Sequence, residues 1–145
     1  MGRRLLIVSG AFVLVLGSFF GTLALLDLYD PAHALNQKRN ADVAKLKDAI
    51  DRYYSDRNAY PMLPVSPVDE LAKDLVPGYL KEIPTDPLRA AGVFQYQYAS
   101  DGRTKYAIWM RYAAEKFGSR SAGDCVTGVG ARGLPAFSHL PECQF

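Results

Sequence analysis

The sequence contains few of the residues from which catalytic and metal sites are built. Its 145 residues include two cysteines and two histidines. The histidines, His33 and His139, lie far apart, and their spacing from the cysteines fits no zinc pattern. No nucleophile elbow, phosphate-binding loop or paired-cysteine motif is present. We therefore expect no enzyme activity, no metal site and no other cofactor.

An excess of one charge is also lacking. The formal net charge is +2, and basic and acidic residues are interspersed after residue 36. Proteins that bind nucleic acid neutralise many phosphates with clustered lysines and arginines. Because no such cluster is present, we expect no nucleic-acid partner.

Charge is entirely absent from residues 5–26, which read LLIVSGAFVLVLGSFFGTLALL. As a helix this run would be roughly 33 Å long, enough to cross a hydrocarbon core of about 30 Å. Arg3 and Arg4 precede it and favour a cytoplasmic N-terminus. The sequence therefore predicts a cytoplasmic tip (1–4), a single transmembrane helix in the lipid bilayer (5–26) and an extracytoplasmic domain (27–145).

A cleaved signal peptide is the alternative interpretation of the same run. Ala32, His33 and Ala34 fit a small-x-small cleavage pattern. The apolar run, however, is longer than the roughly 7–15 residues typical of a signal peptide. We favour an uncleaved anchor, and a secreted periplasmic domain remains the alternative.

Three glycines of the uncharged run, Gly10, Gly17 and Gly21, fall on nearly the same face of a helix. Small residues allow two helices to approach closely in lipid, where packing drives association. We predict that this face packs against membrane helices of other subunits or of a homo-oligomer. Glycine is also common in membrane helices generally, so background composition is the alternative.

Residues 32–56 have the spacing of an amphipathic helix, with Asp30 as cap and Pro31 as first residue. The apolar positions are Val43, Leu46, Ile50 and Tyr53. Charged residues, Arg39 and Asp42 among them, are expected to cover the exposed surface. The apolar stripe would pack on a sheet of the same chain; a partner helix is the alternative.

Prolines punctuate the segment that follows this helix. Pro61 ends the helical pattern, and Ser66 and Pro67 have the pattern of a cap and a first helical residue. The short helix that they would begin runs to about Val76, where Pro77 and a glycine stop it. We therefore expect one short helix before the sheet.

A hairpin is predicted in the second half of the chain. Residues 94–98 alternate strictly, which places Tyr96 and Tyr98 on one face of a strand. Residues 100–103 form a turn, and residues 105–112 form the returning strand. A third short strand is expected near Cys125. The predicted fold is α+β, with a long N-terminal helix packed on a small antiparallel sheet.

The two cysteines, Cys125 and Cys143, are both near the C-terminus. Outside the cytoplasm a disulfide is the default for such a pair. A metal site shared with a histidine is the alternative, which the spacing does not favour. We therefore predict a disulfide bond.

Several tyrosine and proline motifs occur in a fixed order across residues 40–112. They are Tyr53-Tyr54, Tyr60-Pro61, Val76-Pro77-Gly78-Tyr79-Leu80, Ile83-Pro84-x-Asp86-Pro87 and Tyr96-x-Tyr98. With the preceding membrane helix, this order resembles the type IV pilin-like proteins, especially the major pseudopilin of type II secretion systems. The resemblance implies a pilin-like fold, a structural role and a bacterial inner membrane with the domain in the periplasm. It also suits a C-terminal disulfide, which is widespread in pilins.

The resemblance fails at the features that polymerisation requires. Polymerising members have a prepilin peptidase site and a buried glutamate near the mature N-terminus. Gly10-Ala11-Phe12 stands in roughly the corresponding place, but residues 5–26 contain no carboxylate. The acidic calcium-binding loop of the major pseudopilin is not evident either. We predict a structural or accessory subunit of an inner-membrane complex, with a pseudopilin of a type II secretion or type IV pilus machine as the alternative.

Overall fold

The computed structural model describes residues 30–91, 95–115 and 122–145. The chain divides into two units, Met1–Pro31 and Ala32–Phe145, and the second is called the head domain below. The predicted membrane segment, with Gly10, Gly17 and Gly21, lies outside the described residues. Among the helices that are described, none combines the length and the apolar character needed to span a membrane.

Helix α2 (Pro31–Arg57) is the longest element, with 27 residues. Proline is tolerated at its first position because the N–H that proline lacks has no partner there. No other proline and no glycine interrupts it. The helix ends at Asn58, which has a left-handed φ of 52° and donates its N–H to the Tyr54 carbonyl at 2.7 Å.

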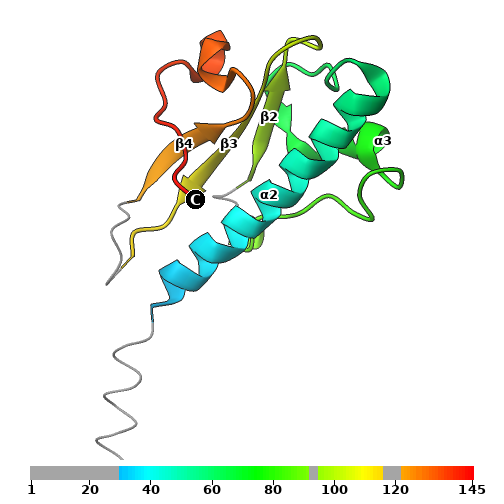
Figure 1. Cartoon of the computed structure of the whole chain (residues 1–145). Helices are drawn as coiled ribbons and strands as arrows, with labels where there is room; N and C mark the ends of the chain where they lie inside the picture. The colour runs from blue at the N-terminus through cyan, green and yellow to red at the C-terminus, as the bar shows by residue number, and fades with distance from the viewer. Residues whose placement is uncertain (1–29, 92–94, 116–121) are drawn as a thin grey trace, which may run out of the picture. The chain divides into compact units, whose positions relative to one another are not determined.

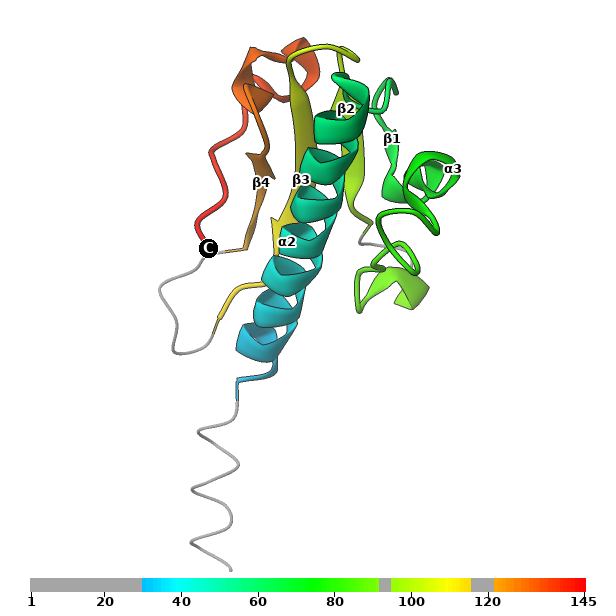
Figure 2. The same cartoon turned by 45° about the vertical axis from the view of Figure 1, so that its right-hand side comes forward.

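Four antiparallel strands form one sheet in the order β1-β2-β3-β4. The strands are β1 (Ser66–Pro67), β2 (Gln97–Ser100), β3 (Tyr106–Tyr112) and β4 (Gly123–Thr127). The remaining elements are short: η1 (Val68–Leu71), α3 (Ala72–Leu75), η2 (Arg89–Ala91), η3 (Ala131–Gly133) and η4 (Pro135–Phe137). Helix α2 runs across one face of the sheet (Figures 1 and 2). The predicted α+β fold is confirmed.

The main core lies between α2 and the sheet. On the helix, Val43, Leu46 and Ile50 are fully buried, and Tyr53 packs partly buried against the same cluster. The sheet contributes Tyr96, Tyr98, Tyr106, Ile108 and Met110. Because strand side chains alternate between faces, every second residue of β3 points to α2.

A smaller cluster covers the opposite face of the sheet. Ala107 and Trp109 of β3 point there and pack with Phe137 of the C-terminal segment. The sheet is therefore enclosed by α2 on one side and partly by residues 131–140 on the other.

The prediction that Ser66 and Pro67 begin a helix is wrong, because both residues form β1. Ser66 pairs with Tyr98, and Pro67 pairs with Gln97. Proline has no N–H to donate, so it is tolerated here only because β1 is at the edge of the sheet. The short helical segment begins one residue later, where the Val68 N–H is donated to the Tyr96 carbonyl at 3.1 Å.

The hairpin is confirmed, but its first strand lies later in the chain than predicted: β2 begins at Gln97, so Gln95 and Tyr96 precede it. Strand β2 continues through Ser100, which pairs with Tyr106, so the turn begins at Asp101. One carboxylate oxygen of Asp101 accepts backbone N–H groups of Arg103, Thr104 and Lys105, each at 2.9 Å. These hydrogen bonds lower the pKa of Asp101 to about 2. Residue 94 lies outside the described part of the chain.

Candidate functional site

A buried ion pair joins α2 to the loop between α3 and β2. Arg39 Nε donates to Asp86 Oδ2 at 2.7 Å, and Arg39 Nη2 donates to Asp86 Oδ1 at 3.3 Å. The exposed fractions of the two side chains are 0% and 2%. The expectation that Arg39 and Asp42 lie on the solvent-exposed face of the helix is therefore wrong. The loop between α3 and β2 covers this face of α2 and supplies the carboxylate that Arg39 requires.

Asn36 extends this polar cluster toward the end of β3. Its side-chain oxygen accepts from Arg39 Nη1 at 3.2 Å and from the Ala113 N–H at 3.0 Å. Its amide nitrogen donates to the Ala113 carbonyl and to Glu115 Oε1, both at 2.9 Å. Among the described residues, no buried side-chain nitrogen or oxygen atom lacks a partner. The cluster is therefore fully hydrogen-bonded, as a buried charged group requires.

Tyrosine hydroxyls make a second set of polar contacts with α2. Each donates to an oxygen on a polar side chain of the helix. The pairs are Tyr96–Asp42 at 3.2 Å, Tyr106–Asp51 at 3.3 Å, Tyr112–Asn40 at 2.7 Å and Tyr79–Asp56 at 2.9 Å. The first three of these directional bonds fix the position of α2 on the sheet, and the bond from Tyr79 joins α2 to the loop after α3.

Burial raises the pKa of three core tyrosines well above its ordinary value. For Tyr96 and Tyr106 desolvation is the main cause, followed by the negative charges of Asp42 and Asp51 respectively. For Tyr98 desolvation again dominates. Each hydroxyl therefore stays protonated, as a donor must.

These tyrosines make the head domain sensitive to alkaline pH. A group whose pKa is raised by folding contributes its full stability below its unfolded pKa, which is about 10 for tyrosine, and loses it as the pH rises further. We expect the tyrosine contribution to the free energy of unfolding to be constant up to about pH 10 and to fall above it. Urea titrations of the full chain in neutral detergent at different pH values would measure this free energy. Tyrosinate absorbance would report the ionisation of the tyrosines in the same samples. In Tyr106→Phe the alkaline loss should be smaller; an equal loss would show that Tyr106 does not contribute.

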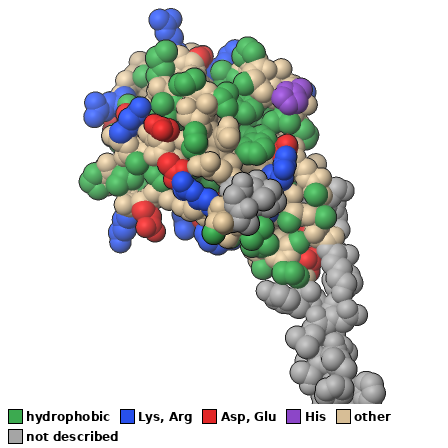
Figure 3. Space-filling view, turned by 180° about the vertical axis from the view of Figure 1, so that it is seen from behind, with side chains coloured by type: hydrophobic (Ala, Val, Ile, Leu, Met, Phe, Trp, Pro, Cys, Tyr) green, Lys and Arg blue, Asp and Glu red, His purple; other side chains and the backbone are tan. Residues whose placement is uncertain are grey.

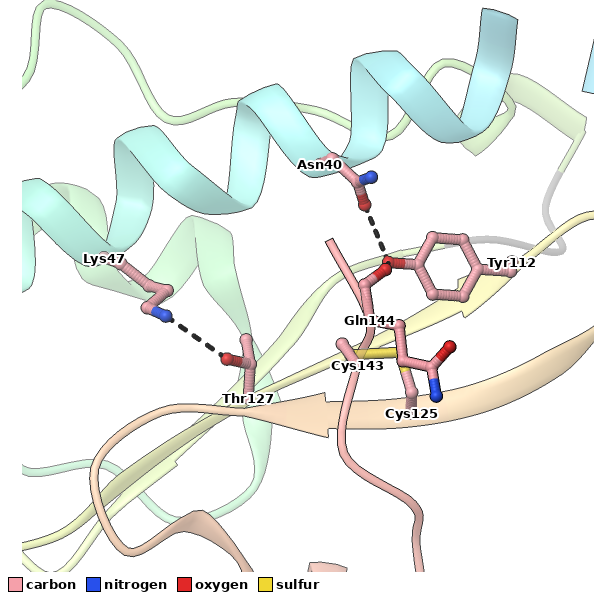
Figure 4. The surroundings of a disulfide bond; sticks show 7 residues. All are labelled: Asn40, Lys47, Tyr112, Cys125, Thr127, Cys143 and Gln144. Atoms are coloured by element: carbon pink, nitrogen blue, oxygen red, sulfur yellow. Dashed lines mark hydrogen bonds between the residues drawn. A yellow bond between two sulfur atoms is a disulfide. The ribbon is translucent and has the colours of Figure 1, made fainter. Parts of the chain in front are cut away.

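The C-terminal tail (residues 141–145) is held beside β4 and α2 (Figure 4). Cys143 is disulfide-bonded to Cys125 of β4, so the predicted disulfide is present. The Val126 N–H donates to the Pro141 carbonyl, and the Cys143 N–H donates to the Val126 carbonyl, both at 2.9 Å. The Tyr112 hydroxyl reaches the Gln144 carbonyl at 2.9 Å. The tail therefore covers part of the outer edge of β4.

A cleft lies beside α2, between the helix and residues 80–85, and is called the α2 cleft below. Its volume is about 500 Å³. Three lysines line it, Lys38, Lys45 and Lys81, together with the acidic residues Asp42 and Glu82. The rest of its wall is Leu80, Ile83, Pro84 and Thr85. Figure 2 shows the light-green segment that forms this wall beside the lower turns of α2.

A second cavity, of about 220 Å³, lies on the opposite face of the sheet. It is lined by Gln97, Trp109 and Asp124 of the sheet and by residues of the C-terminal segment, including His139 and Leu140. Seen from behind, apolar, basic and acidic side chains are interspersed over the surface of the head domain (Figure 3). Charge of one sign does not dominate there, so charge does not indicate what kind of partner this cavity would bind.

No catalytic arrangement emerges from the geometry of residues 30–91, 95–115 and 122–145. In these ranges no group of three or more His, Cys, Asp or Glu side chains could hold a metal ion. His33 lies 3.4 Å from Glu115, whereas His139 lines the second cavity. The two histidines therefore belong to different parts of the head domain.

Arg39, Asn36 and Asp86 are the residues that sequence reasoning missed. A signal for two of them exists in the spacing. Arg39 lies four residues before Val43, and Asn36 lies three before Arg39, so both continue the apolar stripe of α2. A polar residue in such a stripe is buried wherever the covering surface extends that far. No local pattern, however, identifies Asp86 as the partner.

Comparison with protein families found a match. Residues 28–125 match a family model described as type II secretion system (T2SS), protein G. This region includes α2, the first three strands, the Arg39–Asp86 pair and the wall of the α2 cleft, but not the C-terminal tail. Searches of curated proteins and of solved structures returned no match.

Proposed function

Since the chain belongs to the type II secretion system protein G family, the family of the major pseudopilins, we propose that it is a non-enzymatic structural subunit of an inner-membrane protein complex. Residues 5–26 would anchor it in the bilayer, with the N-terminus in the cytoplasm and the head domain in the periplasm. The family match is the observation that carries the structural role. It agrees with the described part of the head domain, in which every buried side-chain nitrogen and oxygen atom has a hydrogen-bond partner within the protein.

The uncharged anchor favours a subunit that remains in the membrane. A carboxylate within lipid is costly and is expected only where it has a partner. Polymerising relatives have such a carboxylate, whereas residues 5–26 of this chain have none. We therefore favour an accessory subunit that packs laterally against other membrane helices, through Gly10, Gly17 and Gly21.

A pseudopilin that enters the filament of a type II secretion machine is the second candidate. The family match favours it directly, because the model that matches is that of type II secretion system protein G, the family of the major pseudopilins. The two candidates differ in the N-terminus of the mature chain.

Intact-mass measurement of the protein extracted from its native membrane separates these candidates. We expect an unprocessed chain with Arg3 and Arg4 retained. A chain that begins near Ala11 or Phe12 would reject the anchored subunit in favour of the filament subunit. A chain that begins at Leu35 would reject both in favour of a secreted domain.

Lateral packing has its own test in the same protein. Gly17→Ile and Gly21→Ile should each reduce co-purification of partner subunits in mild detergent, because a large side chain prevents close approach of the helices. Thr22→Ile is the matched control, since it lies about 100° around the helix from Gly21. If the glycine variants co-purify as the control does, the glycine face is background composition.

A further inference from the structure

The α2 cleft is held open at both ends by polar contacts. At one end the Arg39–Asp86 ion pair fixes the chain to α2. At the other end Arg52 Nη2 donates to the Tyr79 carbonyl at 2.8 Å. Arg39 and Arg52 are about 20 Å apart along the helix axis. Residues 80–85 bridge this distance, so the cleft is formed before any ligand binds.

The side chains of the cleft present a net positive charge beside an apolar wall, because three lysines face the two acidic residues Asp42 and Glu82. Lys38 is neutralised by Asp42, whose two carboxylate oxygens lie 2.9 and 2.8 Å from Lys38 Nζ. Lys45 and Lys81 are exposed, and neither forms an ion pair or a side-chain hydrogen bond within the described part of the chain. Leu80 and Ile83 are partly exposed next to them.

We infer that the α2 cleft is a docking site for an extended, acidic segment of a partner protein. Carboxylates of the partner would pair with Lys45 and Lys81, and an apolar side chain between them would contact Leu80 and Ile83. Charge complementarity of this kind selects the partner and accelerates association. The residues of α2 that line the cleft, from Lys38 to Lys45, span about 10 Å along the helix axis, and an extended chain rises about 3.3 Å per residue, so about three residues of the partner would lie within the cleft.

This inference rests on the proposed function, because a structural subunit requires a partner, but it places the contact on the head domain and not on the membrane segment. Other anionic surfaces could also meet the lysines. An anionic lipid headgroup and a second copy of this chain are the two that the experiment must separate from an acidic segment.

The test uses the full chain in nanodiscs of neutral phosphatidylcholine, observed by amide NMR. The probe is a synthetic peptide of alternating glutamate and leucine, about six residues long. We expect saturable shift changes at Lys45, Leu80, Lys81 and Ile83. A matched peptide of alternating lysine and leucine should cause none, and added salt should weaken the binding.

Charge reversal supplies the matched variants. Lys45→Glu combined with Lys81→Glu should weaken peptide binding by about tenfold or more. Lys73→Glu, an exposed lysine of α3 outside the cleft, should leave it unchanged. An unperturbed amide spectrum away from the cleft shows that each variant is folded.

Four results would overturn the inference: equal shifts with the lysine peptide, no weakening in the double variant, the same shifts from phosphatidylglycerol nanodiscs without peptide, or the same shifts on raising the protein concentration alone. The last two would assign the cleft to a lipid headgroup and to a second copy. None of these results depends on N-terminal processing or co-purification, so the proposed function and the docking site can fail separately.

Discussion

Replacing Asp86 with alanine is expected to lower the free energy of unfolding of the head domain by about 3–5 kcal/mol. The substitution leaves the Arg39 guanidinium buried, at 0% exposure, without a counter-charge. It also removes the acceptor of the Leu88 N–H, which Asp86 Oδ1 binds at 2.8 Å. Urea titration of the full chain in neutral detergent, monitored by the fluorescence of Trp109, would measure the loss.

Two further variants test whether the unpaired charge of Arg39 causes this loss of stability. Arg39→Met combined with Asp86→Leu removes both charges together and should recover most of the stability, because no unpaired charge stays buried. Arg89→Met breaks an exposed ion pair with Asp69, whose side chains are 44% and 38% exposed, and should cost at most about 1 kcal/mol. If Asp86→Ala costs no more than Arg89→Met, the buried pair does not hold the loop on α2.

Elements with a strong local period were predictable from the sequence. Val43, Leu46 and Ile50 are spaced three and four residues apart, and this spacing indicated α2 and the face that it buries. The alternation in β3 separated Tyr106, Ile108 and Met110 from Trp109 on the other face. In both elements one periodic face is buried, so the local pattern and the tertiary structure agree.

Contacts between distant segments were not predictable in this way. Arg39 and Asp86 are 47 residues apart, and nothing near Asp86 indicates that it meets a helix. Strand β1 has only two residues, and it exists because Tyr98 and Gln97 lie opposite them. Its own composition therefore indicated a helix cap, and tertiary pairing overrode that local preference.

The α2 cleft depends on the same distant contacts. Its lysines are unremarkable surface residues in the sequence, and only the position of residues 80–85 brings Lys81 toward Lys45. Arg39 and Asp86 therefore do more than stabilise the head domain, because they also place one wall of the proposed docking site. Asp86→Ala should accordingly weaken binding of the acidic peptide even where the domain stays folded.

Removing the disulfide is the second substitution with a large expected effect. The bond links Cys125 and Cys143, which are 18 residues apart. A loop of this size constrains the unfolded chain by about 3 kcal/mol in the loop-entropy account, and small exported domains commonly lose about 2–5 kcal/mol without a native disulfide. We expect Cys125→Ser combined with Cys143→Ser to lower the free energy of unfolding by that amount in the same urea titration.

The local consequence is release of the C-terminal tail. Of the tail side chains, only Cys143 is buried, and two backbone hydrogen bonds join the tail to Val126. Hydrogen exchange at the Val126 and Cys143 amides should therefore accelerate in the double serine variant well beyond the global change in stability. Tyr112→Phe is the control, since it removes the hydroxyl bound to the Gln144 carbonyl and leaves the disulfide intact. Protection that survives in the serine variant would show that the hydrogen bonds suffice to hold the tail. Loss of protection would instead leave the outer edge of β4 open to pairing with another strand, which the disulfide in this structure prevents.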